Sequence, residues 1–233
     1  MTRVVAIVPA YQEAGRVAPA VTALKEFCDR IIVVDDGSTD ATADEAAAAG
    51  ARVIRSSRNR GKGSALAAGI RAAGADAQVL LLADADLASS ASTLRALLRP
   101  VVDGEADLTI AAPPPSGPSG FGLVESLARH GIKALARLDT TRPLSGQRAI
   151  RADLASRLRL DRRFGVETGM TIDAVRLGAR VVEVPCAFTH ARTGRDLAGF
   201  AHRAKQGLGV GRAVLRRLPG LLRRPPKRGN VAS

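Results

Sequence analysis

The sequence predicts an α/β fold in which a mostly parallel sheet carries helices on both faces. Two observations favour this fold. Short apolar runs of strand length alternate with longer segments of helical periodicity through the first half of the chain. The short runs are apolar at consecutive positions, as expected for parallel strands that are buried on both faces. With 233 residues and 46% hydrophobic content, the chain can form one large domain.

The predicted elements alternate regularly up to residue 111. Strands are expected at 3–10, 30–36, 51–57, 77–86 and 106–111, and helices at 15–28, 39–50, 61–74 and 90–104. A loop rich in Pro and Gly follows at 112–122, and is either a mobile segment over a site or an inert connection. The expected elements after it are a helix at 123–138, a strand turning into a helix over 143–154, a helix at 165–178, strands at 179–185 and 186–191, and a basic helical segment broken by prolines.

Basic residues concentrate near the C-terminus. The net charge is +13, and from Arg192 to Arg228 there are eleven Lys and Arg against one acid, Asp196, a surplus of ten. Such a segment suits an anionic surface. Aromatic residues make up only 3% of the chain, too few for the base stacking on which single-strand binders rely. An anionic membrane is therefore the expected partner rather than a nucleic acid, with an ordinary helix packed on its own domain as the alternative.

Neither end of the chain predicts a membrane span. The N-terminal apolar run is too short for a signal peptide, and no segment approaches the roughly 20 apolar residues that cross a bilayer. We expect a cytoplasmic protein that is at most peripheral on the inner face of the cell membrane. Cys28 and Cys186 lie far apart without CxxC spacing, which favours two small buried hydrophobic side chains over a zinc site or a disulfide.

Acidic pairs follow two of the predicted strands. Asp84 and Asp86 end the run VLLLADAD, and Asp35 and Asp36 end RIIVVDD. Ligands of parallel sheets bind beyond the carboxyl ends of the strands. Two carboxylates at i and i+2 on one side of a strand repel each other, and a hard cation offsets that repulsion. The first pair thus predicts a Mg²⁺ or Mn²⁺ site, with a helix start capped by Asp86 as the alternative; the second pair could accept bonds from a base or ribose.

The stretch NRGKG, residues 59–63, places a lysine between two glycines before a helix. This arrangement can approach a diphosphate closely, with Lys62 as a point charge. A turn followed by a helix cap is the alternative.

Four segments, VPAYQEAGRV, VVDDGSTDAT, NRGKGSAL and LLADADL, resemble family 2 glycosyltransferases in order and spacing. These enzymes have the nucleotide-sugar-binding GT-A fold. In the second half, SGQRAIRADL and GVETGMTIDAVRLGARVVEVPCAFTHARTGRDL resemble the subgroup of dolichol-phosphate mannosyltransferases and polyprenyl-phosphate sugar synthases. The resemblance implies a GT-A domain over 1–200, with a nucleotide-sugar-binding half at 1–111 and an acceptor half at 112–200, followed by a basic tail at 201–233.

The resemblance also implies roles for the matched positions. A GDP- or UDP-linked sugar donor is expected to contact a nucleoside set of Pro9, Tyr11, Glu13, Val34 and Asp36 and a phosphate set of Ala85, Arg148 and Arg192. The implied metal ligands are Asp84 and Asp86, joined by His190 unless that residue is a satisfied strand histidine. The implied catalytic set is Asp86, Glu167 and Arg192. One departure from the subgroup is Ala88, where a polar residue often helps to hold the metal.

The implied activity is metal-dependent transfer of a sugar from a nucleoside diphosphate to polyprenyl phosphate. The same chemistry on a soluble phosphorylated acid or alcohol is the alternative, and a non-catalytic nucleotide-binding module is a third. A hydroxyl acceptor would need Glu167 as general base. A lipid phosphate, whose second pKa is about 6, would not, and Glu167 would then orient an arginine.

Overall fold

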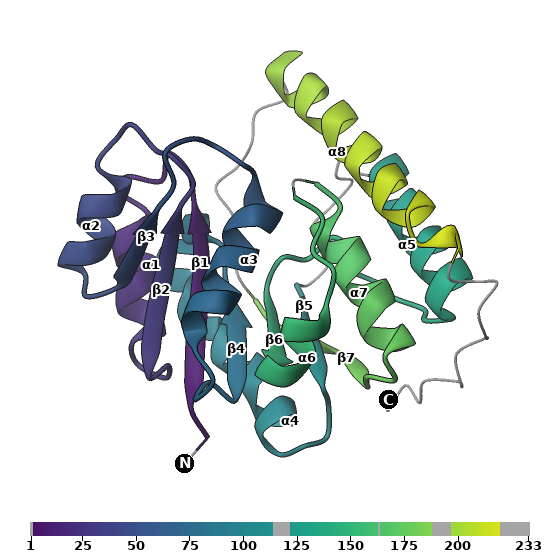
Figure 1. The fold of residues 1–233 in the computed structure, drawn as a ribbon, viewed down its shortest axis with the longest axis horizontal. Coiled ribbons are helices and arrows are strands. Elements are labelled where there is room, and N and C mark those ends of the chain that lie inside the picture. The colour runs from purple at the N-terminus through teal and green to yellow at the C-terminus, as the bar shows by residue number, and fades with distance from the viewer. Residues whose placement is uncertain (1, 114–121, 163, 188–196, 220–233) are drawn as a thin grey trace.

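Seven strands form one sheet in the order β3-β2-β1-β4-β6-β5-β7 (Figure 1). The computed structural model describes residues 2–113, 122–162, 164–187 and 197–219. The strands are β1 (Val4–Ala10), β2 (Arg30–Asp35), β3 (Arg52–Arg55), β4 (Val79–Leu82), β5 (Leu108–Ala112), β6 (Arg148–Arg151) and β7 (Val181–Pro185). Only β6 runs antiparallel to its neighbours, β4 and β5, so the predicted mostly parallel sheet is confirmed.

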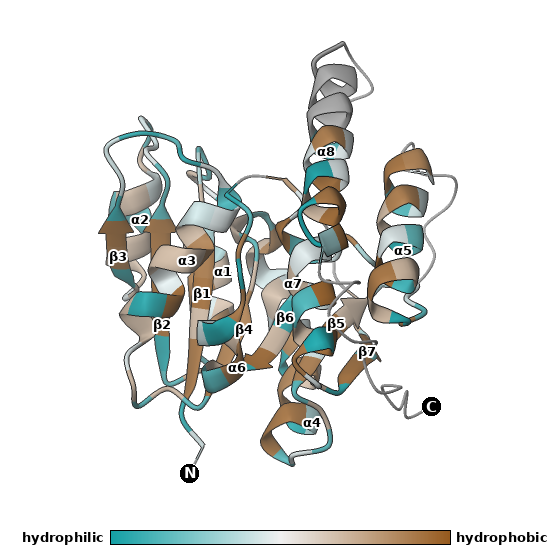
Figure 2. Cartoon of the chain, turned by 45° about the vertical axis from the view of Figure 1, so that its right-hand side comes forward, coloured by the Kyte–Doolittle hydropathy of each residue, from teal (hydrophilic) through white to brown (hydrophobic). Residues whose placement is uncertain are grey.

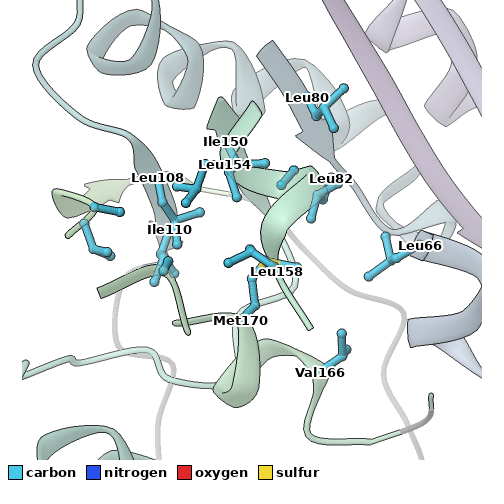
Figure 3. Close-up of a cluster of buried hydrophobic side chains, with 14 of the residues drawn as sticks. Leu66, Leu80, Leu82, Leu108, Ile110, Ile150, Leu154, Leu158, Val166 and Met170 are labelled. Atoms are coloured by element: carbon cyan, nitrogen blue, oxygen red, sulfur yellow. The ribbon is translucent and has the colours of Figure 1, made fainter. Parts of the chain in front are cut away.

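Helices cover both faces of this sheet (Figure 1). One layer contains α3 (Lys62–Ala73), α5 (Gly122–Ala136), α6 (Ala152–Arg157) and α7 (Val166–Arg176). The other contains α1 (Val17–Leu24), α2 (Thr42–Ala48), a 3₁₀ segment (Ala85–Leu97) and α4 (Leu98–Val102). Alternate strand residues serve the two layers, since Ile7 and Leu82 belong to the first core and Ala6 and Leu81 to the second. Figure 3 shows the first core, and Figure 2 shows the hydrophobic strands between the layers.

The helix predicted at 90–104 is mostly 3₁₀ instead. The 3₁₀ segment ends at Leu97, and only Leu98–Val102 is α-helical. Hydroxyls of the SSAST run donate to carbonyls three residues back: Ser90 to Leu87 at 2.7 Å and Thr93 to Ser90 at 2.8 Å. Such local bonds compete with the α-helical hydrogen bonds, which explains the tighter winding.

Two predicted strands are shorter than expected. The run at 77–86 is a strand only over Val79–Leu82, so both aspartates lie beyond it, and the argument that they share one side of a strand does not hold. Asp84 rather than Asp86 takes the position before the 3₁₀ segment, and its side chain makes no capping hydrogen bond. After β7, Cys186 and Ala187 are not in a strand, and 188–191 lie outside the described residues.

The final described helix, α8 (Leu197–Leu215), packs against α5 and α7. The predicted boundary between residues 200 and 201 falls inside this helix. Val210 and Ala213 are fully buried, so at least this part of the predicted tail belongs to the domain. Among the described residues, no helix has the length and apolar character needed to cross a membrane.

Candidate active site at the strand ends

The sheet order reverses between β1 and β4, because the chain moves outward from β1 in both directions. The carboxyl ends of strands at such a switch point form the usual ligand crevice of open α/β sheets. Both strands are followed by a non-glycine residue with positive φ, Gln12 at 58° and Ala88 at 47°. Backbone strain of this kind concentrates at functional sites.

Three acidic residues follow the two strands that flank this point. Glu13 follows β1, while Asp84 and Asp86 follow β4. Burial raises the pKa of Glu13, and although Arg16 opposes the rise, the charges of Asp86 and Asp84 add to it. The Glu13 carboxylate lies 2.6 Å from Arg16 Nε. Glu13 is therefore close enough to Asp84 and Asp86 to feel their charges, while the metal-binding role of the two aspartates stays a prediction.

Asp84 is held by side chains from two other elements. Lys62 Nζ, in the first turn of α3, lies 2.7 Å from Asp84 Oδ1 and 3.0 Å from Glu167 Oε1 at the start of α7. Gln147, directly before β6, donates from Nε2 to Asp84 Oδ2 at 2.7 Å and accepts from the Asp84 amide at 3.0 Å. Burial disfavours the Lys62 charge, but Asp84 and Glu167 outweigh it and raise the lysine pKa.

These ion pairs give Lys62 partners that the sequence did not predict. The lysine was expected to meet a diphosphate, and that contact stays a prediction. The structure shows its ammonium between two carboxylates at the centre of the site. Lys62 links Glu167 on α7 to Asp84, because its ammonium contacts both carboxylates.

The residues expected around the nucleoside lie at the ends of β1 and β2. Pro9 pairs with Val34 in the sheet, and Tyr11 is 48% exposed just beyond β1. The side chain of Val34 is in the core against Gly69, so only its backbone faces this edge. Ala85 is likewise buried and could reach a diphosphate only through its backbone.

The carboxylate pair at the end of β2 has structural partners. Asp36 accepts hydrogen bonds from the amides of Arg60 at 2.9 Å and Gly61 at 2.6 Å, and so fixes the NRGKG loop. Asp35 accepts from the Ser38 amide at 2.9 Å. The nucleoside role implied for Asp36 stays a prediction, because most of its acceptor capacity already holds the loop that leads to Lys62.

Arg148 lies in the interior. It is 1% exposed, and its guanidinium donates to the Ser145 carbonyl and the Thr171 hydroxyl, both at 2.9 Å. Burial lowers its pKa to about 10, although the charges of Glu167 and Glu183 oppose that fall. Its Nη2 has no hydrogen-bond partner among the described residues. In this arrangement, the contact with phosphate that the resemblance implies would need Arg148 to turn out of the core.

Sequence reasoning missed Gln147, although it stands next to Arg148 in a segment already singled out. Its role depends on β6 running antiparallel, which brings the start of that strand to the edge where β4 ends. His190 and Arg192, expected as metal ligand and phosphate ligand, lie outside the described residues.

The sequence of this chain is similar to those of known proteins. Residues 5–152 match the model of glycosyl transferase family 2. An undecaprenyl-phosphate mannosyltransferase of Micrococcus luteus is 30% identical over 214 residues, which are 83% of this chain and 86% of the relative.

The fold of this chain is also similar to solved structures. Glucosyl-3-phosphoglycerate synthase from Mycobacterium tuberculosis, in complex with Mg²⁺ and UDP, has a TM-score of 0.79 and 25% identity, over 93% of this chain and 79% of that chain. The same enzyme with Mn²⁺, UDP-glucose and phosphoglyceric acid has a TM-score of 0.78 and 26% identity, again over 93% and 79%. The chain therefore belongs to glycosyl transferase family 2 and is a glycosyltransferase of the GT-A fold.

Proposed function

We propose that this glycosyltransferase depends on Mg²⁺ or Mn²⁺ and moves a sugar from a nucleoside-diphosphate sugar to polyprenyl phosphate. The observation that carries the proposal is the position of Asp84 and Asp86 directly after β4, where the strand order of the sheet reverses. The acceptor is favoured by the undecaprenyl-phosphate mannosyltransferase relative, which matches over most of both chains.

The oxygen ligands available at this site suit a hard divalent cation. Asp84 and Asp86 offer carboxylate oxygens, but the described residues contain no group of three or more His, Cys, Asp or Glu that could hold a metal ion. Mg²⁺ is commonly bound by one or two carboxylates together with substrate phosphates, so a donor diphosphate would complete this site. A bound Mg²⁺ or Mn²⁺ would supply positive charge for the departing diphosphate.

Lys62 and Glu167 have defined tasks in this proposal. Their ion pair at 3.0 Å fixes the Glu167 carboxylate beside Asp84. A lipid phosphate, with a second pKa of about 6, is already an oxyanion at neutral pH and gives up no proton on attack. Glu167 then orients Lys62 and favours the charge of Arg148, and it takes no proton from the acceptor.

The surface of α8 supports a peripheral contact with anionic lipid on the inner face of the cell membrane. Leu208 and Leu215 are 64% and 62% exposed, and Arg212 lies between them on the same side of the helix. An apolar stripe with basic residues beside it is typical of helices that lie in a membrane interface. This surface would keep the enzyme close to a lipid acceptor.

The central experiment measures transfer of radiolabelled sugar from UDP-, GDP- and dTDP-sugars to polyprenyl phosphate with Mn²⁺ or Mg²⁺. We expect label in the organic phase, lost on addition of EDTA and in Asp86→Asn. A protein that never delivers label to that phase, with any donor, contradicts the lipid acceptor.

Liposome flotation tests the α8 surface separately. Leu208→Glu combined with Leu215→Glu should reduce binding to anionic vesicles. Leu177→Glu, at an exposed leucine directly after α7, is the control and should bind as wild type does. If wild type, the double variant and Leu177→Glu bind the vesicles equally, α8 does not support a membrane contact.

A soluble phosphorylated acid is the second candidate acceptor. It is favoured by the solved structure that contains phosphoglyceric acid and covers 93% of this chain. Labelled phosphoglycerate would stay in the aqueous phase together with the unreacted nucleotide sugar, so anion-exchange chromatography of that phase decides. With a hydroxyl acceptor, Glu167→Gln should remove the general base and abolish transfer.

A further inference from the structure

The carboxylate of Asp84 is bonded at both oxygens by side chains from elsewhere in the fold. Lys62 contacts Oδ1, and Gln147 donates to Oδ2. Gln147 also accepts from the Asp84 amide, so one side chain fixes both the backbone and the carboxylate of that residue. We name Lys62, Gly146 and Gln147 the Asp84 clamp.

The fold explains why Gln147 can reach this position. In the antiparallel pairing of β4 with β6, Leu82 lies opposite Arg148, so the residues just before β6 lie beside those just after β4. Gln147 is fully buried, and a buried amide side chain that makes both of its hydrogen bonds to one residue has a defined orientation.

Gly146 leaves the space that the clamp needs. A Cβ atom at this position would lie 2.9 Å from Asp84 Oδ2 and would overlap Lys62 Nζ. Real Cβ atoms do not approach so closely, so any other residue at 146 would displace the lysine, the aspartate or both. The requirement for glycine here is steric, since 146 is not among the positions with positive φ.

We propose that Gln147 is a positioning residue, which acts with Lys62 and Gly146 to set the orientation in which Asp84 receives the metal and the donor diphosphate. This inference rests on the proposed function. An amide suits the task because it donates to the carboxylate without adding a second positive charge near a divalent cation. Partners of this kind, which orient a ligand without touching the metal, typically change metal affinity about 10- to 100-fold when removed.

The test is Mn²⁺ binding in the presence of UDP, followed by electron paramagnetic resonance and calorimetry. Gln147→Met keeps the length of the side chain and removes both hydrogen bonds. Gly146→Ala disturbs the clamp by another route. We expect each variant to bind Mn²⁺ about tenfold more weakly or worse, and the resonance of the bound ion to broaden as its ligand becomes less ordered.

Thr109→Val is the matched control. Thr109 is a fully buried polar residue on β5 whose hydroxyl donates to the Leu97 carbonyl at 2.8 Å rather than to a clamp residue. The control should lower the melting temperature while leaving Mn²⁺ affinity unchanged. Folded Gln147→Met with wild-type Mn²⁺ affinity would overturn the proposal, as would an equal loss of affinity in Thr109→Val.

The outcomes separate the clamp from the function that it serves. If wild type binds Mn²⁺ with nucleoside diphosphate, and the clamp variants bind it weakly, the clamp stands even when no sugar reaches a lipid or a phosphoglycerate acceptor. If wild type binds no Mn²⁺ with UDP, GDP or dTDP, the metal-dependent function and the clamp both fail.

Discussion

Replacing Arg217 should destabilise the whole domain. This residue follows α8, and its side chain is 5% exposed. It bonds Asp161 Oδ2 at 2.7 Å and Asp173 Oδ2 at 2.6 Å, and it donates to the Arg159 carbonyl at 2.7 Å. Arg217→Met would leave two carboxylates without this cation, and breaking a buried ion pair from one side costs about 3–5 kcal/mol.

The structure places the expected loss at the lower end of that range. Asp161 keeps a second contact at 3.0 Å with Arg216, and the side chain of Asp173 is 19% exposed. We therefore expect the free energy of unfolding to fall by about 3 kcal/mol. In urea, with an m-value of about 1–3 kcal/mol/M, the midpoint should fall by about 1 M or more.

The assay is urea unfolding followed by circular dichroism, with Arg99→Met as control. Arg99 pairs with Asp103 at 3.4 Å on the surface, its side chain 87% exposed, so its loss should cost no more than about 0.5 kcal/mol. A double-mutant cycle with Asp161→Asn should give a coupling of about 0.5–3 kcal/mol. If Arg217→Met and Arg99→Met lower stability equally, the buried network does not anchor α8.

Three further predictions concern the site, the acid stability and the thiols. Lys62→Met should lower kcat at least about tenfold, because Asp84 and Glu167 lose the cation between them. Transfer at the wild-type rate would contradict a role for these two ion pairs in the reaction. Asp107 is partly buried, but hydrogen bonds from Arg180 and Arg151 outweigh burial and lower its pKa from the ordinary value of an aspartate. Its stabilisation is therefore present above the unfolded pKa and is lost as pH falls through the folded pKa. Asp107→Asn should therefore lose more stability at pH 7 than at acidic pH, in thermal melts at both values. Burial raises the pKa of Cys28 to about 12, so this thiol should react with Ellman's reagent at pH 8 only after unfolding, and rapid labelling of the native protein would show that it is accessible.

The first half of the fold is predictable because each signal there is local. Apolar runs such as VLLLA and RIIVV identify strands whatever the rest of the chain does, and the helices between them require parallel neighbours. The exception, the SSAST run, also has a local cause, since its hydroxyls compete for backbone carbonyls. Helical periodicity alone does not report that competition.

The candidate site is predictable only in part. Asp84 and Asp86 stand out because two acids directly after a buried strand are unusual. Gln147 gives no such signal, since an isolated amide in a short polar segment is compatible with any surface turn. Its partner is 63 residues away in the sequence, and the pairing depends on the direction in which β6 enters the sheet.

The sequence by itself determined the fold class, the alternation of strands and helices, and the presence of acidic side chains at strand ends, because these follow from backbone periodicity and from the order of residues along one segment. The tertiary structure alone decided that Lys62 lies between Asp84 and Glu167, that Gln147 holds Asp84, and that the basic C-terminal helix is tied to the domain through Arg217. Each of these contacts joins segments that are distant along the chain. The energy of each contact depends on burial and on interatomic distance. Both are set only when the distant segments have packed together in the folded domain.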